Sequence, residues 1–240
     1  MLLDIHTHIL PGVDDGASNI RESRRLLGML KSQKVDAALC TPHMYVPLDD
    51  AKQHIEEIKA AFETVTNDRE AQAAGIELFL GYEVAYFPGM SHCDMIRDLT
   101  LGGTDKLLLE MRLAPVTDRI VDDILEMAYR YHIVPVFAHL ERYIKMRGFD
   151  KLLEIIESGD ALAQLTAAVF PGNAANKPMA SLIEGGYVSF IGSDCHSVDK
   201  RPPMIDEFFR YAEKKFSVGF TNYIEENNSA LYDELKAGRR

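Results

Sequence analysis

Apolar runs of strand length alternate with segments of helical period along the whole chain, and this alternation constrains the fold more than any other feature. Seven such runs predict strands at residues 2–6, 35–40, 76–80, 106–109, 133–138, 161–165 and 187–191. Repeated βα units indicate an α/β fold with a parallel sheet, because parallel strands need long crossover connections. Right-handed crossovers would let this sheet curl into a barrel; a doubly wound open sheet is the alternative.

Local signals mark several of the intervening helices. Asn19 stands three residues before Glu22, which predicts a capping-box-like start for a leucine-bearing helix. Thr117 is a plausible N-cap for a later helix. Residues 91–98 predict a short helix, and residues 204–235 predict a helical tail in two pieces.

The bulk composition excludes several classes of protein. The 240 residues contain no Gly/Ser-rich linker or low-complexity segment, so we expect a single domain over residues 1–240. The three cysteines (Cys40, Cys93, Cys195) are odd in number and widely spaced, which fits a reducing compartment. Neither a signal-peptide pattern nor an apolar run of membrane-spanning length is evident, so we expect a cytoplasmic protein without membrane insertion. A net charge of −11 argues against nucleic-acid binding.

Residues that can bind a metal ion follow the predicted strands. The first strand runs into His6 and His8, whose side chains leave the same side of an extended backbone. In a parallel barrel the carboxyl ends of all strands share one face, where active sites form. Imidazoles and carboxylates suit a divalent first-row metal. The residues at these strand ends are His6, His8, His43, Glu83, Glu110, His139, Asp194 and His196.

Three other histidines serve as internal controls for this pattern. His54 lies within a predicted helix, His92 lies near a helix start, and His132 precedes a strand. His54 and His132 therefore do not share the common face, and we interpret all three as structural.

The motifs resemble those of a known superfamily. The D-x-H-x-H opening at residues 4–8, His43, His139 and the D-x-H at residues 194–196 resemble the PHP (polymerase and histidinol phosphatase) superfamily, whose members have a distorted seven-stranded barrel and a three-metal site. Within it, five segments resemble the CpsB/CapC-type bacterial tyrosine phosphatases. These are LPGVDDG at 10–16, TPH at 41–43, GYEV at 81–84, HLERY at 139–143, and GSDCH at 192–196 followed by RPP at 201–203.

The resemblance implies a role for each site residue. His6, His8, Glu83 and Asp194 would hold the first metal; Glu83 would bridge to a second, completed by Glu110 and His139; and Asp14, His43 and His196 would hold the third. Arg142 and Arg201 would bind the phosphate, whose oxygens a guanidinium fork fits. The family implies up to three Mn²⁺ ions, and the donor types leave zinc or iron open. Asp15 has no assigned ligand role.

The same resemblance implies the reaction. Closely spaced metals clamp a phosphate and lower the pKa of a bridging water, producing a hydroxide nucleophile. The expected substrate is phosphotyrosine in a protein, namely the tyrosine-rich tail of a bacterial tyrosine kinase that regulates capsule or exopolysaccharide synthesis. Two alternatives remain: a small-molecule phosphomonoesterase such as a histidinol phosphatase, and a non-catalytic PHP module. Tyr45, Tyr86, Phe87 and Tyr143 lie near the predicted mouth and could stack on a tyrosyl ring or simply pack the loops.

Residues 195–201 also fit the C-x5-R pattern of cysteine-dependent tyrosine phosphatases. Such a phosphate loop needs small residues, usually glycines, so that backbone N–H groups can converge on the phosphate. No glycine lies between Cys195 and Arg201, and Asp194 beside the cysteine disfavours a thiolate. We therefore prefer the metal-dependent mechanism.

Overall fold

The computed structural model describes residues 1–47, 50–169 and 177–238, and nine strands lie within these ranges. Every strand pair is parallel. Both faces of such strands are covered, which explains why several of them are buried along their whole length. The strands are β1 Leu3–Thr7, β2 Ala37–Cys40, β3 His43–Met44, β4 Glu77–Leu80, β5 Glu83–Ala85, β6 Lys106–Glu110, β7 Val134–Phe137, β8 Leu162–Thr166 and β9 Phe190–Gly192.

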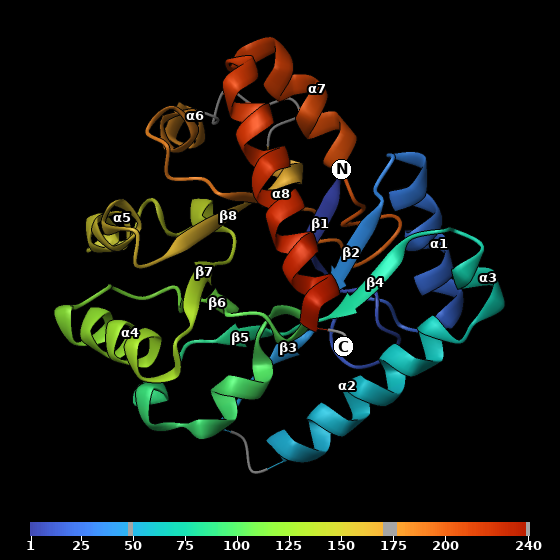
Figure 1. The fold of residues 1–240 in the computed structure, drawn as a ribbon, viewed down its shortest axis with the longest axis horizontal. Coiled ribbons are helices and arrows are strands. Elements are labelled where there is room, and N and C mark those ends of the chain that lie inside the picture. Colours follow the sequence, from blue (N-terminus) through green and yellow to red (C-terminus); the bar gives the residue numbers. More distant parts are fainter. Residues whose placement is uncertain (48–49, 170–176, 239–240) are drawn as a thin grey trace.

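The strands form two sheets that meet. The order is β1-β2-β4 in the smaller sheet and β3-β5-β6-β7-β8-β9 in the larger. Thr7 at the end of β1 bridges to Cys195 just past β9, and the His8 backbone N–H donates to the Cys195 carbonyl over 2.9 Å. The first and last strands are therefore neighbours. The result is a curled parallel sheet (Figure 1), not the doubly wound open sheet considered as an alternative.

The sheets also come close at two interrupted strands. A break of two residues separates β2 from β3, and another separates β4 from β5. The Glu83 N–H donates to the Pro42 carbonyl over 3.0 Å, which links the two breaks.

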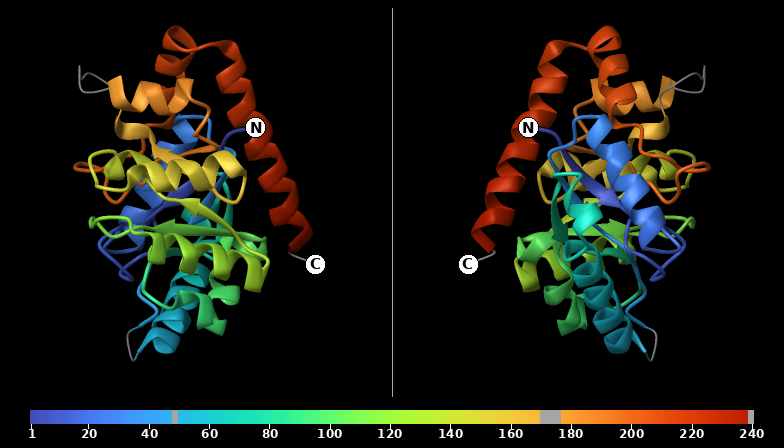
Figure 2. Two further views of the ribbon diagram at one scale, coloured as in Figure 1. Left: turned by 90° about the vertical axis from the view of Figure 1, so that its left-hand side faces the viewer. Right: turned by 90° about the vertical axis from the view of Figure 1, so that its right-hand side faces the viewer.

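The helices cover the sheet on its outside, and α8 crosses in front of the strands (Figure 1). Figure 2 shows α8 running along one edge of the molecule. The α-helices are α1 Ile20–Ser32, α2 Ala51–Thr66, α3 Arg69–Gln72, α4 Asp118–Tyr131, α5 Phe149–Ser158, α6 Lys177–Glu184, α7 Ile205–Lys215 and α8 Val218–Gly238. Short 3₁₀ helices are η1 Met90–His92, η2 Asp94–Leu99, η3 Leu101–Gly103, η4 Leu140–Tyr143 and η5 Ala167–Val169.

Two apolar clusters hold these layers together. The larger lies between the strands and the helices α1 to α7 and also includes Ile224 of α8. The smaller joins the other face of the strands to Leu231 and Leu235 of α8. Burying one such leucine contributes about 1.5–3 kcal/mol. Tyr232 and Glu234 of α8 bond to Glu77 and Lys106, the first residues of β4 and β6. α8 therefore covers the amino-terminal ends of the strands, opposite the predicted site.

The structure corrects the sequence prediction in several places. Each predicted strand has a counterpart, but β3 and β5 were not predicted. Residues 91–98 form the end of η1 and most of η2, not an α-helix. Asn19 caps α1 as predicted, but Glu22 reaches back to the Ser18 N–H and not to the N–H of Asn19. Thr117 is the N-cap of α4 without a side-chain hydrogen bond. Within the described ranges, no helix is long and apolar enough to cross a membrane.

Candidate metal centre

The structure brings all eight predicted strand-end residues together on the carboxyl side of the curled sheet. They come from six places along the chain. Three overlapping sets of side chains could hold metal ions: the first donor group is His6, His8 and Asp194, the second is His43, Glu83 and Glu110, and the third is His8, Asp15, His43 and His196. His139 lies beside the second donor group, 2.7 Å from Glu83. Most of the eight strand-end residues are fully buried, and His43 and Glu110 are half-buried. His54, His92 and His132 belong to none of the donor groups found in the described part of the chain.

The first donor group joins His6, His8 and Asp194, with Glu83 beside them. The Nε2 atoms of the two histidines lie 3.0 Å apart and 3.5–3.6 Å from Asp194 Oδ1. Both Nδ1 atoms face acceptors, Gln164 Oε1 for His6 and a carboxylate oxygen for His8, which fixes the tautomers. The two Nε2 atoms therefore face each other, an arrangement that needs a proton or a metal ion between them.

The pKa of His8 also indicates that the surrounding carboxylates favour a positive charge at this position. Burial disfavours a charged ring, but hydrogen bonds to Asp14, Asp194 and Glu83 outweigh burial and raise the pKa of His8 well above its ordinary value. A proton therefore supplies the charge that a bound metal ion would otherwise supply.

Glu83 connects the first donor group to the second. Its Oε2 lies 3.2 Å from the Nε2 atoms of both His6 and His8, and its Oε1 accepts from His139 Nε2 over 2.7 Å. Glu110 Oε1 lies 3.4 Å from the same His139 nitrogen. Burial would raise the pKa of Glu83, but the histidines around it hold that pKa well below its usual range. Glu83 is therefore a charged carboxylate that faces both groups, as a bridging ligand must.

The third donor group contains Asp15 in the place predicted for Asp14. Asp15 Oδ1 lies 3.2 Å from His196 Nε2 and 3.5 Å from His43 Nε2. Asp14 Oδ2 instead accepts from His8 Nδ1 over 2.7 Å, and its Oδ1 accepts from the Gly16 N–H over 2.9 Å. The structure thus differs from the sequence prediction: Asp14 orients His8, and Asp15 faces the two histidines.

The fold of the turn explains this exchange. A Cβ at Gly16 would lie 2.1 Å from the His8 carbonyl oxygen, so only glycine lets the turn come this close to the end of β1. The Ala17 N–H donates to that carbonyl over 2.9 Å and closes the turn. The first aspartate is thereby placed beside His8. Burial would raise the pKa of Asp14, but the bond from His8 lowers it to about 2.

Both predicted arginines reach the centre. Arg142 Nη2 and Arg201 Nη2 donate to the same oxygen, Asp194 Oδ2, over 2.6 and 2.7 Å. The other oxygen of Asp194 faces His6 and His8. The two arginine side chains are 38% and 40% exposed, so a ligand can reach them. A cavity of 590 Å³ opens beside them, and Lys200 also lines it.

Backbone strain coincides with two of the donors. His139 and Asp194 have φ values of 36° and 52°, in the left-handed region that residues other than glycine rarely adopt. Such conformations cost on the order of 1–3 kcal/mol each and persist where the surrounding structure enforces them.

Sequence reasoning missed two residues that hold the donors in place. Gln164 on β8 accepts from both His6 Nδ1 and the His139 N–H, so it orients two ligands at once. Gln164 lies on the one predicted strand that supplies no metal-capable residue. A polar residue in that otherwise apolar strand was the signal that could have revealed it. Tyr143 was considered for stacking, but its buried hydroxyl bonds to His139 Nδ1 over 3.0 Å.

The thiol of Cys195 is not placed for catalysis. It is fully buried, and burial raises its pKa well above the ordinary value of a thiol. The guanidinium of Arg201 contacts Asp194 and not this cysteine. The C-x5-R pattern is therefore no phosphate loop.

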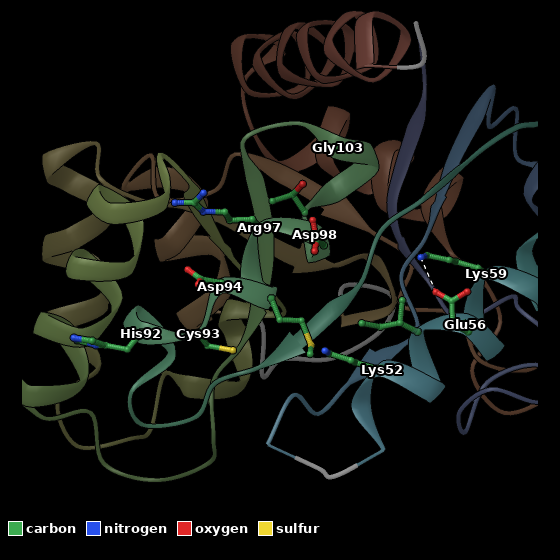
Figure 3. A pocket seen from close by; sticks show the side chains of 12 residues that line it. Lys52, Glu56, Lys59, His92, Cys93, Asp94, Arg97, Asp98 and Gly103 are labelled. Atoms are coloured by element: carbon green, nitrogen blue, oxygen red, sulfur yellow. Dashed lines mark hydrogen bonds and ion pairs between the residues drawn. The ribbon is translucent and has the colours of Figure 1, made fainter.

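A larger cavity lies elsewhere. It measures 1080 Å³ and is lined by α2 and the segment from η1 to η3 (Figure 3). Its walls carry charges of both signs, such as Arg97 and Asp98, and its Lys59 is already paired with Glu56 over 2.8 Å. None of the predicted site residues lines it.

The donor atoms fit divalent metal ions. Glu83 Oε2, His43 Nδ1 and His196 Nε2 are buried without a well-aligned hydrogen bond, although each lies within a donor group and the first two are 3.0 Å apart. A buried polar atom without a partner costs about 1–3 kcal/mol, which metal coordination would offset. The mixture of imidazole and carboxylate suits first-row ions. Fold and site together define a parallel α/β protein with a cluster of side chains that could hold metal ions at the carboxyl ends of its strands.

Comparison with known proteins gives the family. The family model described as "Capsular polysaccharide synthesis, CpsB/CapC" matches residues 2–232, so the chain belongs to the CpsB/CapC family, as its motifs predicted. The putative tyrosine-protein phosphatase CapC of Staphylococcus aureus is 28% identical over 244 residues, covering 97% of this chain and 92% of that protein. The tyrosine-protein phosphatase YwqE of Bacillus subtilis is 26% identical over 239 residues, covering 96% and 91%.

A solved structure confirms the curled α/β fold. It comes from work on YwqE of Bacillus subtilis and CpsB of Streptococcus pneumoniae, which are described there as unique metal-dependent tyrosine phosphatases. The match has a TM-score of 0.80 at 22% identity, and it covers 97% of this chain and 95% of that one.

Proposed function

We propose that this protein is a metal-dependent protein-tyrosine phosphatase that hydrolyses phosphotyrosine at a trinuclear centre. The relatives named tyrosine-protein phosphatases support this activity. The observation that carries the proposal is the position of Asp194. One of its oxygens faces the first donor group, and the other holds Arg142 and Arg201, so two phosphate-binding cations stand directly beside the metal-binding residues.

Three ions would be held by the three donor groups. Mn²⁺ is our proposal for the ions, and iron or zinc would suit the same donors. Asp15 replaces Asp14 as a ligand because it faces His43 and His196. The proposed ligands are His6, His8, Glu83 and Asp194 for the first ion, Glu83, Glu110 and His139 for the second, and Asp15, His43 and His196 for the third.

When bound, divalent ions would neutralise the phosphate and lower the pKa of a water molecule towards neutrality, supplying the nucleophile. Arg142 and Arg201 would leave Asp194 Oδ2 to bind the phosphate oxygens, with geometry that favours bidentate contacts. In-line attack spreads negative charge over the equatorial oxygens, and the two guanidinium groups would stabilise that charge. A phenolate is a better leaving group than an alkoxide, so a strong general acid is not required.

We further propose that the fold is a distorted (β/α)7 barrel in a single domain spanning residues 1–240. The ring has seven members if β2 with β3, and β4 with β5, each count as one interrupted strand. The bridge between Thr7 and Cys195 and the bond from Glu83 to Pro42 support this interpretation.

The partner that we propose is the tyrosine-rich tail of a bacterial tyrosine kinase that regulates capsule or exopolysaccharide synthesis. The family description, which refers to capsular polysaccharide synthesis, supports this role. A net charge of −11 would repel an acidic tail at long range. Attraction must therefore come from the metal ions and the arginines at short range.

Substrate comparison tests the activity. We expect the Mn²⁺-loaded protein to hydrolyse a phosphotyrosine peptide with a kcat/KM well above that for histidinol phosphate. His8→Ala should abolish turnover, while His92→Ala, which alters an exposed histidine outside the donor groups, should not. A preference for histidinol phosphate would indicate a small-molecule phosphatase. Inactivity of the metal-loaded protein on every phosphomonoester would indicate a non-catalytic module.

A further inference from the structure

A second pocket opens beside the metal centre at Glu110, whose Oε1 also lies 3.8 Å from Arg142 Nη1. We call it the aromatic pocket; it measures 490 Å³, and Tyr45, Tyr86, Phe87, Glu110, Met111 and Leu113 line it. We propose that this pocket binds the aromatic ring of the phosphate ester and thereby makes the enzyme selective for aryl over alkyl phosphates. This inference rests on the phosphatase activity proposed above and names the structural basis of its specificity.

The aromatic pocket is continuous with the metal centre at two points. Glu110 lines the pocket and belongs to the second donor group, and its Oε1 lies 3.4 Å from His139 Nε2. The ring of Tyr45 stacks on the ring of His43, with centroids 5.8 Å apart and planes inclined by 30°. A phosphoryl group at the metal centre would therefore have its ester oxygen near the pocket entrance.

The inner wall of the pocket is preformed. Tyr86 is only 4% exposed, and its hydroxyl donates to Asp123 Oδ2 over 3.0 Å. The Tyr86 carbonyl accepts from Arg112 Nε over 3.2 Å. The Met111 N–H donates to the Tyr143 hydroxyl over 3.0 Å, and that hydroxyl also contacts His139. The wall and the metal ligand thus share one hydrogen-bonded framework, so a ring against the wall has a fixed position relative to the ligand.

The outer edge of the pocket consists of exposed apolar side chains. Tyr45 and Leu113 are 46% and 74% exposed, and they are among the few large hydrophobic side chains of the described residues with such exposure. Exposed apolar groups that line a concavity are typical of ligand sites. An aromatic ring between them would remove apolar surface from water and could stack on Tyr45.

The other opening of the metal centre suits a different chemistry. The 590 Å³ cavity beside Asp194 is lined by Arg142, Arg201 and Lys200. These cations suit phosphate oxygens or other anionic groups, while Ala168, Pro202 and Met204 add apolar surface to the same cavity. The phosphate therefore belongs on the arginine side, and the ring of the leaving group belongs in the aromatic pocket.

Two peptides of one sequence test the proposal, one carrying phosphotyrosine and the other phosphoserine. In Tyr45→Ala/Leu113→Ser we expect the preference for phosphotyrosine, measured as the ratio of kcat/KM values, to fall by about tenfold, mainly through KM. Val218→Ser/Tyr223→Ala removes two exposed hydrophobic side chains of α8 and should keep the wild-type ratio. An unchanged ratio in the pocket variant would overturn the inference while the proposed activity stands. A wild-type protein inactive on both peptides would overturn both.

A binding measurement provides an independent test without turnover. The chain contains no tryptophan, so Leu113→Trp introduces a single fluorophore at the pocket edge. In the Mn²⁺-loaded variant, phenylphosphonate should shift the tryptophan emission, and methylphosphonate should not. Equal shifts with both phosphonates would contradict the assignment of the pocket to the ring.

Discussion

Replacement of Asp14 or Asp15 by asparagine should have different effects, although the two residues are adjacent. Asp14 accepts the Nδ1 proton of His8 over 2.7 Å, and this bond outweighs burial in lowering its pKa from 3.8 to about 2. That change corresponds to roughly 2–3 kcal/mol of favourable interaction for the charged carboxylate. Loss of such a supporting bond typically weakens metal affinity about 10–100-fold. Asp14→Asn should therefore bind the full number of ions, but more weakly.

Asp15→Asn should instead remove a ligand. Its carboxylate faces His43 and His196, so the variant should bind one ion fewer while the other sites keep their affinity. Metal analysis gives the number of ions per chain, and competition with a chromogenic chelator gives the affinities. The reasoning is refuted if Asp14→Asn loses one ion and Asp15→Asn keeps all of them.

Three further predictions concern the arginines, the thiol and the pH. Arg142→Lys and Arg201→Lys should each lower kcat/KM about 10²–10³-fold with metal content unchanged, because lysine lacks the planar guanidinium fork that fits phosphate. A change below threefold in steady-state assays would contradict this prediction. Cys195→Ala should keep turnover within about threefold because the thiol is buried, and an inactive but folded variant would point to cysteine chemistry. Metal affinity should rise with pH up to about 9. Burial lowers the pKa of His139, but bonds to Glu110 and Glu83 outweigh it and raise that pKa to about 9, so metal must displace a proton. Calorimetry in buffers of different ionisation enthalpy would detect that proton, and a pH-independent affinity would contradict its release.

The sequence predicted the strands and the shared face because both leave strong local signals. A buried strand followed at once by His6, Glu110 or His139 is visible without coordinates, and parallel topology then places such ends together. The short strands β3 and β5 left no such signal, since they hold two and three residues. Residues 91–98 looked helical, but extended backbone at Cys93 divides η1 from η2.

The finer features of the site depend on contacts between distant segments. Asp14 and Asp15 have different contacts because the turn approaches His8 closely. The two residues are adjacent in the sequence, so their spacing alone does not show which of them contacts His8. Gln164 acts on histidines 158 and 25 positions away. The convergence of both arginines on one Asp194 oxygen likewise requires the folded chain.

The central claim is that phosphotyrosine hydrolysis depends on metal ions held by these donor groups. The most direct measurement is turnover of a phosphotyrosine peptide by chelator-treated protein during stepwise addition of Mn²⁺, with bound metal determined at each step. We expect no turnover without metal, and full turnover once up to three ions are bound per chain. Undiminished turnover in the chelator-treated protein would contradict the account.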